Sequence, residues 1–549
     1  MKYDAIVVGA GLAGLVTVCE MAVRGKNVLL LDQEPVSSIG GQAWWSFGGL
    51  FLVDSPEQRN MKIKDSLELA KQDWYGSATY DNIDGDDHWG SKWADAYLAF
   101  ANGEKREWLK QQGIHFFPVV GWAERGGYLA EGHGNSVPRF HIVWGTGPAI
   151  VEPFARKLIT YIKNKQVTYK PRHQVNDLIT EEGSIVGVKG NVLAPSDAKR
   201  GEKSNRDPIS TFAYFAEHTV IASGGIGANA NLIKQHWPHR LGKAPDKMLT
   251  GVPDHVDGRM IGISENRGAS VVNKDRMWHY TEGIKNHSPV WTNHGIRILP
   301  GPSSIWLDAK GNRFPVPYLP GFDTLGTLEA IMKTNYDYSW FILTQEVIEK
   351  EFALSGSEQN PDLTEKDFKK LLTRLRSGAT QPVQKFIDDG EDFVQAETIE
   401  ELVEKMNRLT NENLLDLDKV KNVVEARDRE MDNTFTKDLQ ITAIRGSRNY
   451  LGDKLIRTAK PHKFLDQKHG PLIAVKLNII SRKTLGGLQT NLNGEVLKEN
   501  GDVLKGLYAV GEASGFGGGG IHGYRSLEGT FLGSCLFTGK RVGEYIGKL

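Results

Sequence analysis

The sequence has 549 residues, of which 40% are hydrophobic and 24% charged, so a small binding module, a disordered chain and a fibrous repeat are all excluded. Lysine plus arginine and aspartate plus glutamate both number 67, and this zero net charge offers no attraction to nucleic acid or to an anionic membrane. The two cysteines, Cys19 and Cys535, cannot build a disulfide framework or a zinc site, so we expect no metal.

The first residues bear on where the protein works. A strand is predicted within a few residues of Met1, which leaves no room for a secretion signal, so we expect a cytoplasmic protein. No apolar run approaches the roughly 20 residues that a membrane-spanning helix needs, so we expect no integral membrane segment.

A dinucleotide-binding βαβ unit is predicted at the N-terminus. An apolar run over residues 4–8 precedes the motif Gly9-Ala10-Gly11-Leu12-Ala13-Gly14, and a helical pattern over 15–24 leads to a second strand over 27–31. Glycines at this spacing allow a tight turn, close approach of backbone N–H groups to a pyrophosphate, and close packing of helix on strand. Asp32 ends the second strand, where an acidic side chain can bind the hydroxyls of an adenosine ribose, and Gln33 follows it. The motif alone does not distinguish NAD from FAD.

Three later segments favour a flavin. Paired glycines within residues 40–49 let backbone lie against a flat ring or a phosphate, although a glycine-rich turn is the alternative. A β-meander is predicted over 167–192, and short buried strands end in glycines within 219–227 and in a carboxylate within 506–512. That carboxylate can accept hydrogen bonds from a ribityl chain. The residues in these segments that we expect to contact the cofactor are Gly40, Gly41, Gln42, Gly48, Gly49, Val175, Ala222, Ser223, Gly224, Gly511 and Glu512.

Two features of the middle of the chain concern structure alone. Residues 194–208 mix proline, serine, glycine and basic residues without an apolar period, which predicts a surface loop. The run Thr398-Ile399-Glu400-Glu401 is typical of a capping box at the start of a helix. Core positions follow it at helical spacing, namely Ile399, Leu402, Val403, Met406 and Leu409.

In their order along the chain, these segments resemble the fumarate reductase and 3-ketosteroid dehydrogenase superfamily of FAD enzymes. The matching stretches are GAGLAG with Asp32, GGQAWWSFGG, ASGGIGAN, SSIWLDAKGNRF, AETIEELVEKMN, KTLGGLQTN and GLYAVGEASG. The resemblance implies FAD and an α/β fold, in which a Rossmann-like FAD-binding domain of the GR2 type carries an inserted α+β substrate-capping domain. It implies an FAD-binding domain assembled from residues 1–272 and 463–549, with the cap at 273–462.

A glycine-rich loop over residues 517–529 precedes the predicted C-terminal helix. A helix that starts there would direct its N–H groups at the flavin, where dipole effects of this kind reach about 2 kcal/mol. We therefore expect Thr530, Phe531 and Leu532 to contact the cofactor, with a flexible linker as the alternative.

The candidate catalytic residues come from the resemblance. Oxidation of a CH–CH bond beside a ketone needs a donor to the carbonyl and a base, and such acid–base groups contribute about 10² to 10⁴ in rate. Tyr524 precedes the C-terminal helix as does the ketosteroid dehydrogenase tyrosine that polarises the keto oxygen, together with a glycine assigned here to Gly529. Tyr318 follows an RF-containing stretch, as the family's proton-abstracting tyrosine does, but the Asn-Glu pair that usually follows RF is missing. A packed core tyrosine is the alternative for Tyr318.

Two further residues and two aromatic stretches are candidates for the substrate pocket. His522 and Arg525 resemble the pair with which fumarate reductases hold a substrate carboxylate, although Arg525 is one residue short of the family register. A hydrogen-bonded loop is the alternative for both. The aromatic stretches 277–280 and 291–294 are typical either of a pocket for a flat apolar ligand or of the core of the cap.

The resemblance implies an FAD-dependent dehydrogenase that oxidises a CH–CH bond next to a ketone, by proton abstraction and hydride transfer to flavin N5. The expected substrate is a small, steroid-like or other hydrophobic cyclic ketone. A fumarate-reductase-type enoate reductase is the alternative, disfavoured by the lack of an arginine between Phe314 and Gln345, and a flavin-binding protein without turnover is the alternative of another class. No second GxGxxG motif serves a nicotinamide, so the expected electron acceptor is a quinone, another carrier or oxygen.

Overall fold

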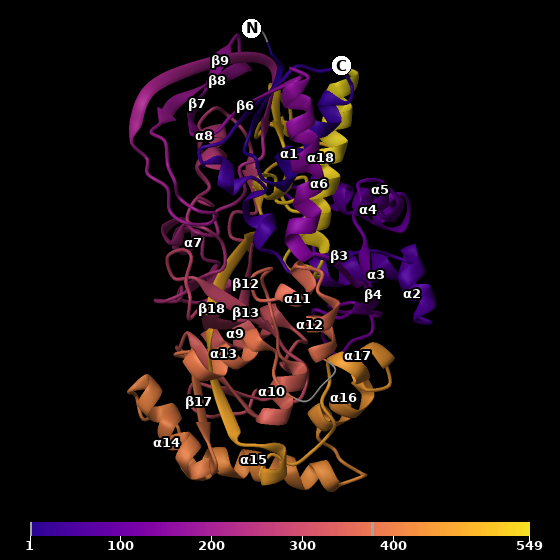
Figure 1. Ribbon diagram of the computed structural model, residues 1–549, viewed down its shortest axis with the longest axis vertical. Helices are drawn as coiled ribbons and strands as arrows, with labels where there is room; N and C mark the ends of the chain where they lie inside the picture. The colour runs from indigo at the N-terminus through magenta and orange to yellow at the C-terminus, as the bar shows by residue number, and fades with distance from the viewer. Residues whose placement is uncertain (1–2, 375–377) are drawn as a thin grey trace.

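The computed structural model describes residues 3–374 and 378–549. Its first sheet is built from both ends of the chain, in the order β20-β21-β9-β1-β2-β6 (Figure 1). The C-terminal strand β21 pairs in parallel with β9, which pairs in parallel with β1, so segments from both ends of the chain lie in one layer. The strands of this sheet are β1 (Tyr3–Val8), β2 (Val28–Leu31), β6 (Val167–Lys170), β7 (His173–Glu181), β8 (Ser184–Leu193), β9 (Pro208–Ile221), β20 (Glu495–Leu497) and β21 (Val503–Ala509).

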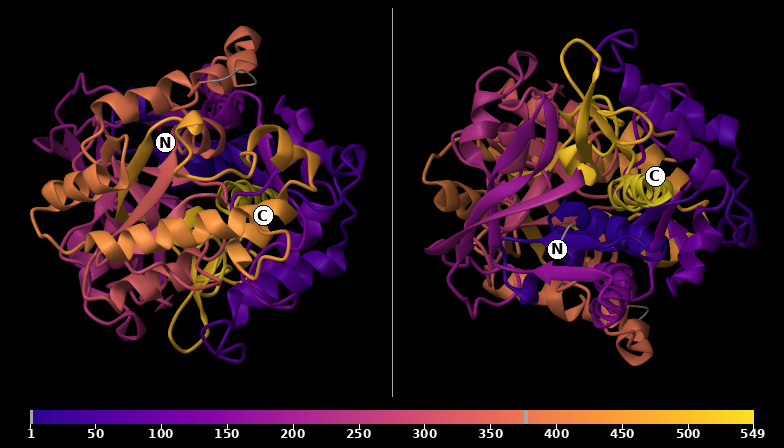
Figure 2. Two further views of the ribbon diagram at one scale, coloured as in Figure 1. Left: turned by 90° about the horizontal axis from the view of Figure 1, so that it is seen from below. Right: turned by 90° about the horizontal axis from the view of Figure 1, so that it is seen from above.

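Three helices pack together beside this sheet. Helix α1 (Leu12–Ala22) lies against α6 (Thr146–Lys163) and α18 (Thr530–Lys548), and Figure 2 shows α1 and α18 adjacent when viewed from above. The contact between α1 and α18 depends on small residues. A Cβ at Gly539 would lie 2.7 Å from the carbonyl oxygen of Ala13, so glycine at this position lets the C-terminal helix approach the dinucleotide motif closely.

A second sheet holds most of the remaining core, in the order β14-β15-β18-β12-β13-β16. It lies in the lower half of Figure 1, and one continuous hydrophobic core runs through both sheets. The predicted boundary at residue 463 falls ahead of β18, which pairs only within this second sheet, so we place the return of the chain to the FAD-binding domain near Thr484 instead. The strands are β10 (Leu249–Thr250), β12 (Met277–Lys285), β13 (Gly295–Leu299), β14 (Ile305–Asp308), β15 (Tyr338–Thr344), β16 (Ala353–Leu354), β17 (Phe393–Ala396) and β18 (Leu472–Thr484).

The remaining elements surround these two sheets. Strands β3 (Gly49–Phe51), β5 (Phe140–Val143) and β4 (Phe116–Gly121) form a small antiparallel sheet, and β11 (Val271–Val272) pairs with β19 (Gly487–Leu488). The helices are α2 (Pro56–Asn60), α3 (Leu67–Ala78), α4 (His88–Asn102), α5 (Lys105–Gln111), α7 (Ala230–Gln235), α8 (Arg259–Glu265), α9 (Thr324–Met332), α10 (Gln345–Glu351), α11 (Pro361–Thr364), α12 (Phe368–Thr373), α13 (Gln381–Asp389), α14 (Ile399–Thr410), α15 (Leu417–Asp432), α16 (Leu439–Ser447) and α17 (Leu451–Ile456). Among these described helices, none combines the length and apolarity needed to cross a bilayer.

The local predictions hold with small differences. The meander forms as β6 to β8, and the segment from 194 to 207 is a loop, as predicted. Helix α14 begins after Thr398, whose hydroxyl accepts a hydrogen bond from the N–H of Glu401 at 3.2 Å. The capping box is not reciprocal, because the Glu401 carboxylate accepts from the N–H of Glu397 instead. Leu409, predicted to be core, is 37% exposed because it lies in the last turn of the helix.

The histidine next to Tyr280 on β12 makes the stability of the fold depend on pH. His279 is buried against Trp237, and burial lowers the pKa of its imidazole to about 4. In the unfolded chain the pKa of histidine is about 6.5. Between about pH 6.5 and pH 4 the imidazole is therefore protonated in the unfolded state but neutral in the folded state, so the free energy of unfolding decreases as the pH falls. This one residue should reduce the free energy of unfolding by about 2 kcal/mol between pH 7 and pH 5.

The test is His279→Phe, with urea denaturation at pH 7 and pH 5. The decrease in unfolding free energy between the two pH values should be about 2 kcal/mol smaller in the variant than in the wild type. His239→Phe, at an exposed position, is the matched control and should leave the decrease unchanged. If His279→Phe loses as much stability as the wild type, the histidine is already charged in the folded protein.

Candidate functional site

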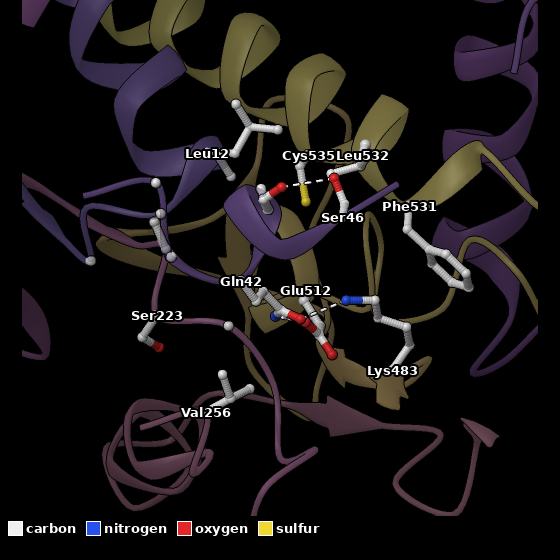
Figure 3. Close-up of a pocket in the computed structure, with 18 of the residues that line it drawn as sticks. Leu12, Gln42, Ser46, Ser223, Val256, Lys483, Glu512, Phe531, Leu532 and Cys535 are labelled. Carbon is white, nitrogen blue, oxygen red and sulfur yellow. Dashed lines mark hydrogen bonds between the residues drawn. The ribbon is translucent and has the colours of Figure 1, made fainter. Parts of the chain in front are cut away.

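Residues from every segment of the predicted cofactor site line a cavity between the two sheets (Figure 3). The side of the first sheet contributes the loops after β1, β2, β9 and β21, and the second sheet contributes residues of β12, β13 and β18. The predicted cofactor residues that line it are Gly9, Gly11, Leu12, Ala13, Asp32, Gln33, Gly40, Gly41, Gln42, Gly48, Gly49, Val175, Ala222, Ser223, Gly224, Glu512, Phe531 and Leu532.

Four predicted contacts do not line the cavity but support its wall. The N–H of Ala10 donates to Asp32 Oδ2 at 2.6 Å, and the N–H of Gly511 donates to the hydroxyl of Thr538. Gly14 faces the first glycine of the motif, because a Cβ there would lie 2.0 Å from the carbonyl oxygen of Gly9. Thr530 bonds to neighbouring loop residues through its hydroxyl.

The nucleotide end of the cavity fits the adenosine half of a dinucleotide. Gly9 has φ 111°, and a Cβ there would lie 2.5 Å from the carbonyl oxygen of Ala222, so no other residue fits this turn. The Asp32 carboxylate is held by two backbone donors, Ala10 and Glu34, at 2.6 and 2.8 Å. Burial nevertheless raises the pKa of the Asp32 carboxyl. A carboxylate that is oriented in this way can accept bonds from two ribose hydroxyls.

We expect Asp32→Asn to weaken FAD binding by about 10- to 100-fold. The reason is that charge-assisted hydrogen bonds to the ribose would become neutral ones. The measurement is titration of apoprotein against FAD, followed by quenching of flavin fluorescence. Asp4→Asn is the control, since that carboxylate accepts a surface bond from the N–H of Asn27, outside the cavity. Equal affinities in the wild type and Asp32→Asn would rule out contact between this carboxylate and the cofactor.

A partly buried polar network crosses the cavity wall between the two predicted glycine segments (Figure 3). The amide of Gln42 donates to the Glu512 carboxylate, and Lys483 Nζ donates to Gln42 Oε1 at 2.5 Å. Glu512 Oε1 also accepts from the N–H of Thr484 at 2.8 Å. Burial lowers the pKa of the Lys483 ammonium to about 8, which makes it a proton donor close to neutral pH. These side chains provide donors and acceptors for the ribityl and ring atoms of a flavin.

Of the residues predicted to act on substrate, only Gly529 lines the cavity. It precedes α18 with φ 89°, so the first turn of the helix, with Phe531 and Leu532, points into the cavity wall. His522 lies behind this wall: Nε2 bonds the Thr530 hydroxyl at 2.9 Å and the ring stacks on Trp74. Burial lowers the pKa of His522 to about 3, so the ring is neutral.

The position of Tyr524 differs from the one that the resemblance implies. Its hydroxyl donates to Asp81 Oδ2 at 2.7 Å, and its ring lies between the guanidinium groups of Arg240 and Arg276. Tyr524 therefore lines a separate polar cleft. The physical reason is the register of the loop: the N–H of Tyr524 bonds to the carbonyl of Ala78, which turns the side chain away from the cavity.

Tyr318 and Arg525 lie close to each other but outside the lining of the cavity. Arg525 Nε is 3.6 Å from Asp323 Oδ1, and the charges of Asp323 and Arg525 both act on Tyr318. Burial raises the pKa of the Tyr318 hydroxyl. The structure thus brings together two of the predicted residues without placing either against the cofactor segments.

Three residues to which the sequence assigned no catalytic role, Tyr280, Arg297 and Glu528, form a polar wall of the cavity. Tyr280 lies under Arg297, with Cζ 3.7 Å from the ring centroid. Arg297 Nη1 donates to Glu528 Oε1 at 2.6 Å, and Glu282 lies 3.7 Å from Arg297 Nε. Burial raises the pKa of the Tyr280 hydroxyl, so it is protonated at neutral pH. This wall combines a hydroxyl donor and a carboxylate acceptor in one cavity.

The aromatic stretches contained a signal for one of these residues. Within 277–280, Tyr280 lines the cavity, so the interpretation of this stretch as part of a pocket applies to this residue. Within 291–294, Trp291 stacks on His294 in the core. Glu528 lies in the glycine-rich loop before Gly529 and Arg297 lies more than 200 residues away, and nothing in either local sequence indicates that they pair with each other.

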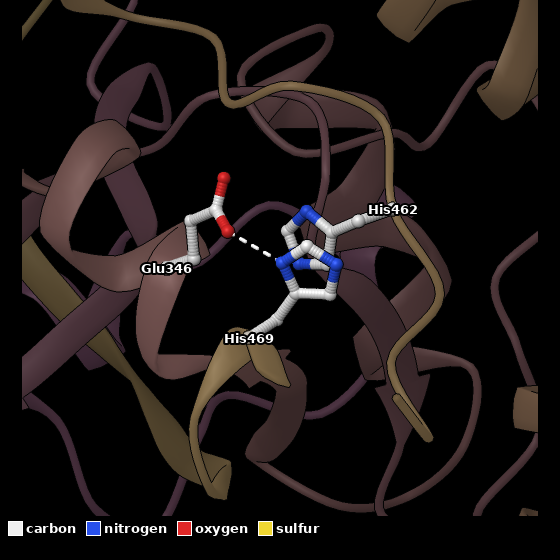
Figure 4. A group of neighbouring side chains, drawn as sticks. All are labelled: Glu346, His462 and His469. Atoms are coloured by element: carbon white, nitrogen blue, oxygen red, sulfur yellow. Dashed lines mark hydrogen bonds and ion pairs between the residues drawn. The ribbon is translucent and has the colours of Figure 1, made fainter. Parts of the chain in front are cut away.

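A separate group on α10 and the segment that leads into β18 contains two histidines and a glutamate (Figure 4). The rings of His462 and His469 stack with centroids 4.0 Å apart, and His469 Nδ1 lies 2.5 Å from Glu346. Both nitrogens of His462 already bond, to Thr344 and to the carbonyl of Lys460. Lone pairs of stacked rings are nearly parallel and do not converge on one ion, so this is a hydrogen-bonded cluster.

Comparison with known proteins places the chain in a family. Residues 4–532 match the family model described as "FAD binding domain". A KsdD-like steroid dehydrogenase of Mycolicibacterium smegmatis is 60% identical over 529 residues, 96% of each chain, and one of Mycobacterium tuberculosis is 58% identical over 99% of this chain and 95% of its own.

A solved 3-ketosteroid Δ1-dehydrogenase from Sterolibacterium denitrificans superposes with a TM-score of 0.68 at 16% identity, covering 100% of this chain and 99% of that one. This likeness confirms the predicted fold, a Rossmann-like flavin-binding domain with a capping domain. The chain therefore belongs to the FAD-binding domain family, and its cofactor is FAD.

Proposed function

We propose that this protein is an FAD-dependent dehydrogenase that oxidises a CH–CH bond next to a ketone in a steroid-like or other cyclic hydrophobic substrate. The observation that carries the proposal is the Tyr280, Arg297 and Glu528 wall, which borders the same cavity as the cofactor segments. The relatives that are 58 to 60% identical carry the name steroid dehydrogenase, which supports the same class of substrate.

Each residue of the wall has a separate task in the proposal. Tyr280, protonated because burial raises its pKa, donates a hydrogen bond to the ketone oxygen and so stabilises the enolate. Glu528 accepts the proton that leaves the α-carbon. Arg297 holds the Glu528 carboxylate in place at 2.6 Å. The chemistry that FAD supplies when bound is acceptance of a hydride at flavin N5.

The apolar part of the cavity suits a ring system. Phe47, Phe140 and Leu299 line it near the polar wall, and the rings of Phe47 and Phe140 stack 6.3 Å apart. Apolar walls with a few convergent polar groups are typical of sites for small hydrophobic ligands.

Stopped-flow spectroscopy of the bound flavin tests the proposal. Anaerobic mixing of oxidised holoenzyme with 4-androstene-3,17-dione or its ring-saturated analogue should bleach the flavin. The enoate reductase alternative predicts instead that dithionite-reduced enzyme is reoxidised by fumarate. Bleaching by neither ketone, together with reoxidation by fumarate, would overturn the proposal.

A further inference from the structure

The cationic side chains of the cavity differ in whether the protein neutralises them. Arg297 is paired with Glu528 and lies near Glu282. Lys483 bonds Gln42, which in turn bonds Glu512. Arg482 also lines the cavity, yet within residues 3–374 and 378–549 its side chain has neither an ion pair nor a hydrogen bond.

The acidic residue near Arg482 does not compensate its charge. Glu358 is half-buried with its Oε2 atom covered, and no Glu358 oxygen in the described structure comes within 4.0 Å of the guanidinium. Burial raises the pKa of Glu358 to about 7, so this carboxyl is neutral for much of the time at neutral pH. His294 is also nearby, and burial together with Arg482 lowers its pKa to about 3, so it is neutral as well.

An arginine in this position is arranged for an anionic ligand. The guanidinium is planar and always charged, and its fork of donors matches both oxygens of a carboxylate. A half-buried cation without a partner is unfavourable until a ligand supplies the opposite charge. Arg482 lies on β18 next to Tyr280 on β12, because Tyr280 pairs with Ile480 and Trp278 with Lys483, and both Arg482 and Tyr280 line the cavity.

We infer that the substrate is a ketone that also carries a carboxylate, and that Arg482 binds this carboxylate. The inference rests on the proposed function, because it names the substrate of the same cavity. The ring body of such a keto acid would lie against Phe140 and Leu299, with its ketone at Tyr280. A neutral ketone of the same shape would bind without using Arg482.

The experiment uses holoenzyme and the visible spectrum of its own flavin as the reporter of binding. The probes are cyclohexanecarboxylate and its methyl ester, and a matched pair of ketosteroids, 3-oxo-4-androstene-17-carboxylate and 4-androstene-3,17-dione. The wild type should bind each acid about 10- to 100-fold more tightly than its neutral counterpart, as expected for charge-assisted bonds. Arg482→Met should remove this preference, and Arg482→Lys should retain part of it.

Arg240→Met is the matched control, because Arg240 lies over Tyr524 in the separate cleft and should leave the preference intact. Equal affinity of the wild type for acids and neutral analogues would overturn the inference, even if a neutral ketosteroid bleaches the flavin and so upholds the proposed function. Equal weakening of acid and neutral ligands in Arg482→Met, or loss of FAD, would overturn it too. A preference for acids that depends on Arg482, without bleaching by any ketone and with reoxidation of the reduced enzyme by fumarate, would uphold the carboxylate site and refute the dehydrogenase.

Discussion

Tyr280→Phe should slow reduction of the flavin by substrate about 10²- to 10³-fold while FAD stays bound. The change removes a single hydroxyl that lines the cavity and leaves the ring under Arg297. Loss of one donor to a developing oxyanion has an effect of this size, because the donor acts mainly in the transition state. The substrate KM should change much less than kcat.

The measurement is single-turnover reduction of the flavin, followed in the visible spectrum after anaerobic mixing with ketosteroid. Tyr524→Phe is a matched control, because the family resemblance implies that Tyr524 is the donor whereas the structure places Tyr280 in the cavity. Its hydroxyl bonds Asp81 in the polar cleft, so the variant should be reduced at close to the wild-type rate. Slow flavin reduction in Tyr524→Phe, together with the wild-type rate in Tyr280→Phe, would assign the role of hydrogen-bond donor to Tyr524 instead of Tyr280.

Arg297→Met should destabilise the folded protein by about 3 to 5 kcal/mol. Arg297 is buried between Glu528 and Glu282, and without it two carboxylates would remain in the interior with no compensating cation. Breaking a buried pair by removal of one partner has this large effect because the remaining charge is desolvated and unpaired. Methionine keeps much of the side-chain volume, so loss of packing contributes little.

Chemical denaturation of the FAD-saturated variant measures this effect. The loss of stability should be smaller at pH 5 than at pH 8. Burial raises the pKa of Glu282, so a folded protein that lacks the guanidinium takes up a proton before the unfolded chain does, and its stability rises as the pH falls. Adding Glu282→Gln to Arg297→Met should restore part of the lost stability. Arg59→Met, at an exposed pair with Asp54, is the control and should change the free energy of unfolding by less than about 1 kcal/mol. A similar loss of stability in Arg297→Met and Arg59→Met would contradict the large effect expected for the buried pair.

Several parts of the cofactor site could be predicted because they are local. The glycines from Gly9 to Gly14 and the carboxylate of Asp32 belong to one short βαβ unit, in which backbone geometry dictates the residue types. The strand that ends near Glu512 could be recognised from its apolar run, and it lies in the first sheet beside β9, as the resemblance implied. The predictions for the glycine motif and Asp32 needed no knowledge of contacts between distant segments.

The residues of the polar wall could not be predicted in the same way. Tyr280, Arg297 and Glu528 meet only because two strands of the second sheet reach the loop before α18. The direction of a side chain in that loop depends on register, and the bond from the N–H of Tyr524 to Ala78 turns this tyrosine outward. This bond joins the loop to the end of α3, more than 440 residues earlier in the chain, so no local pattern encodes that choice.

The sequence by itself thus determined the nucleotide-binding unit, since glycine spacing and apolar periodicity report directly on backbone geometry, whereas FAD and the joining of the two chain ends were implied by the family resemblance. Only the tertiary structure decided which tyrosine lines the cavity and which arginine of the cavity has no partner among the described residues. The physical reason is that pairing of charges and exposure to a cavity are properties of residues brought together from far apart in the chain, so they exist only once the two sheets have packed.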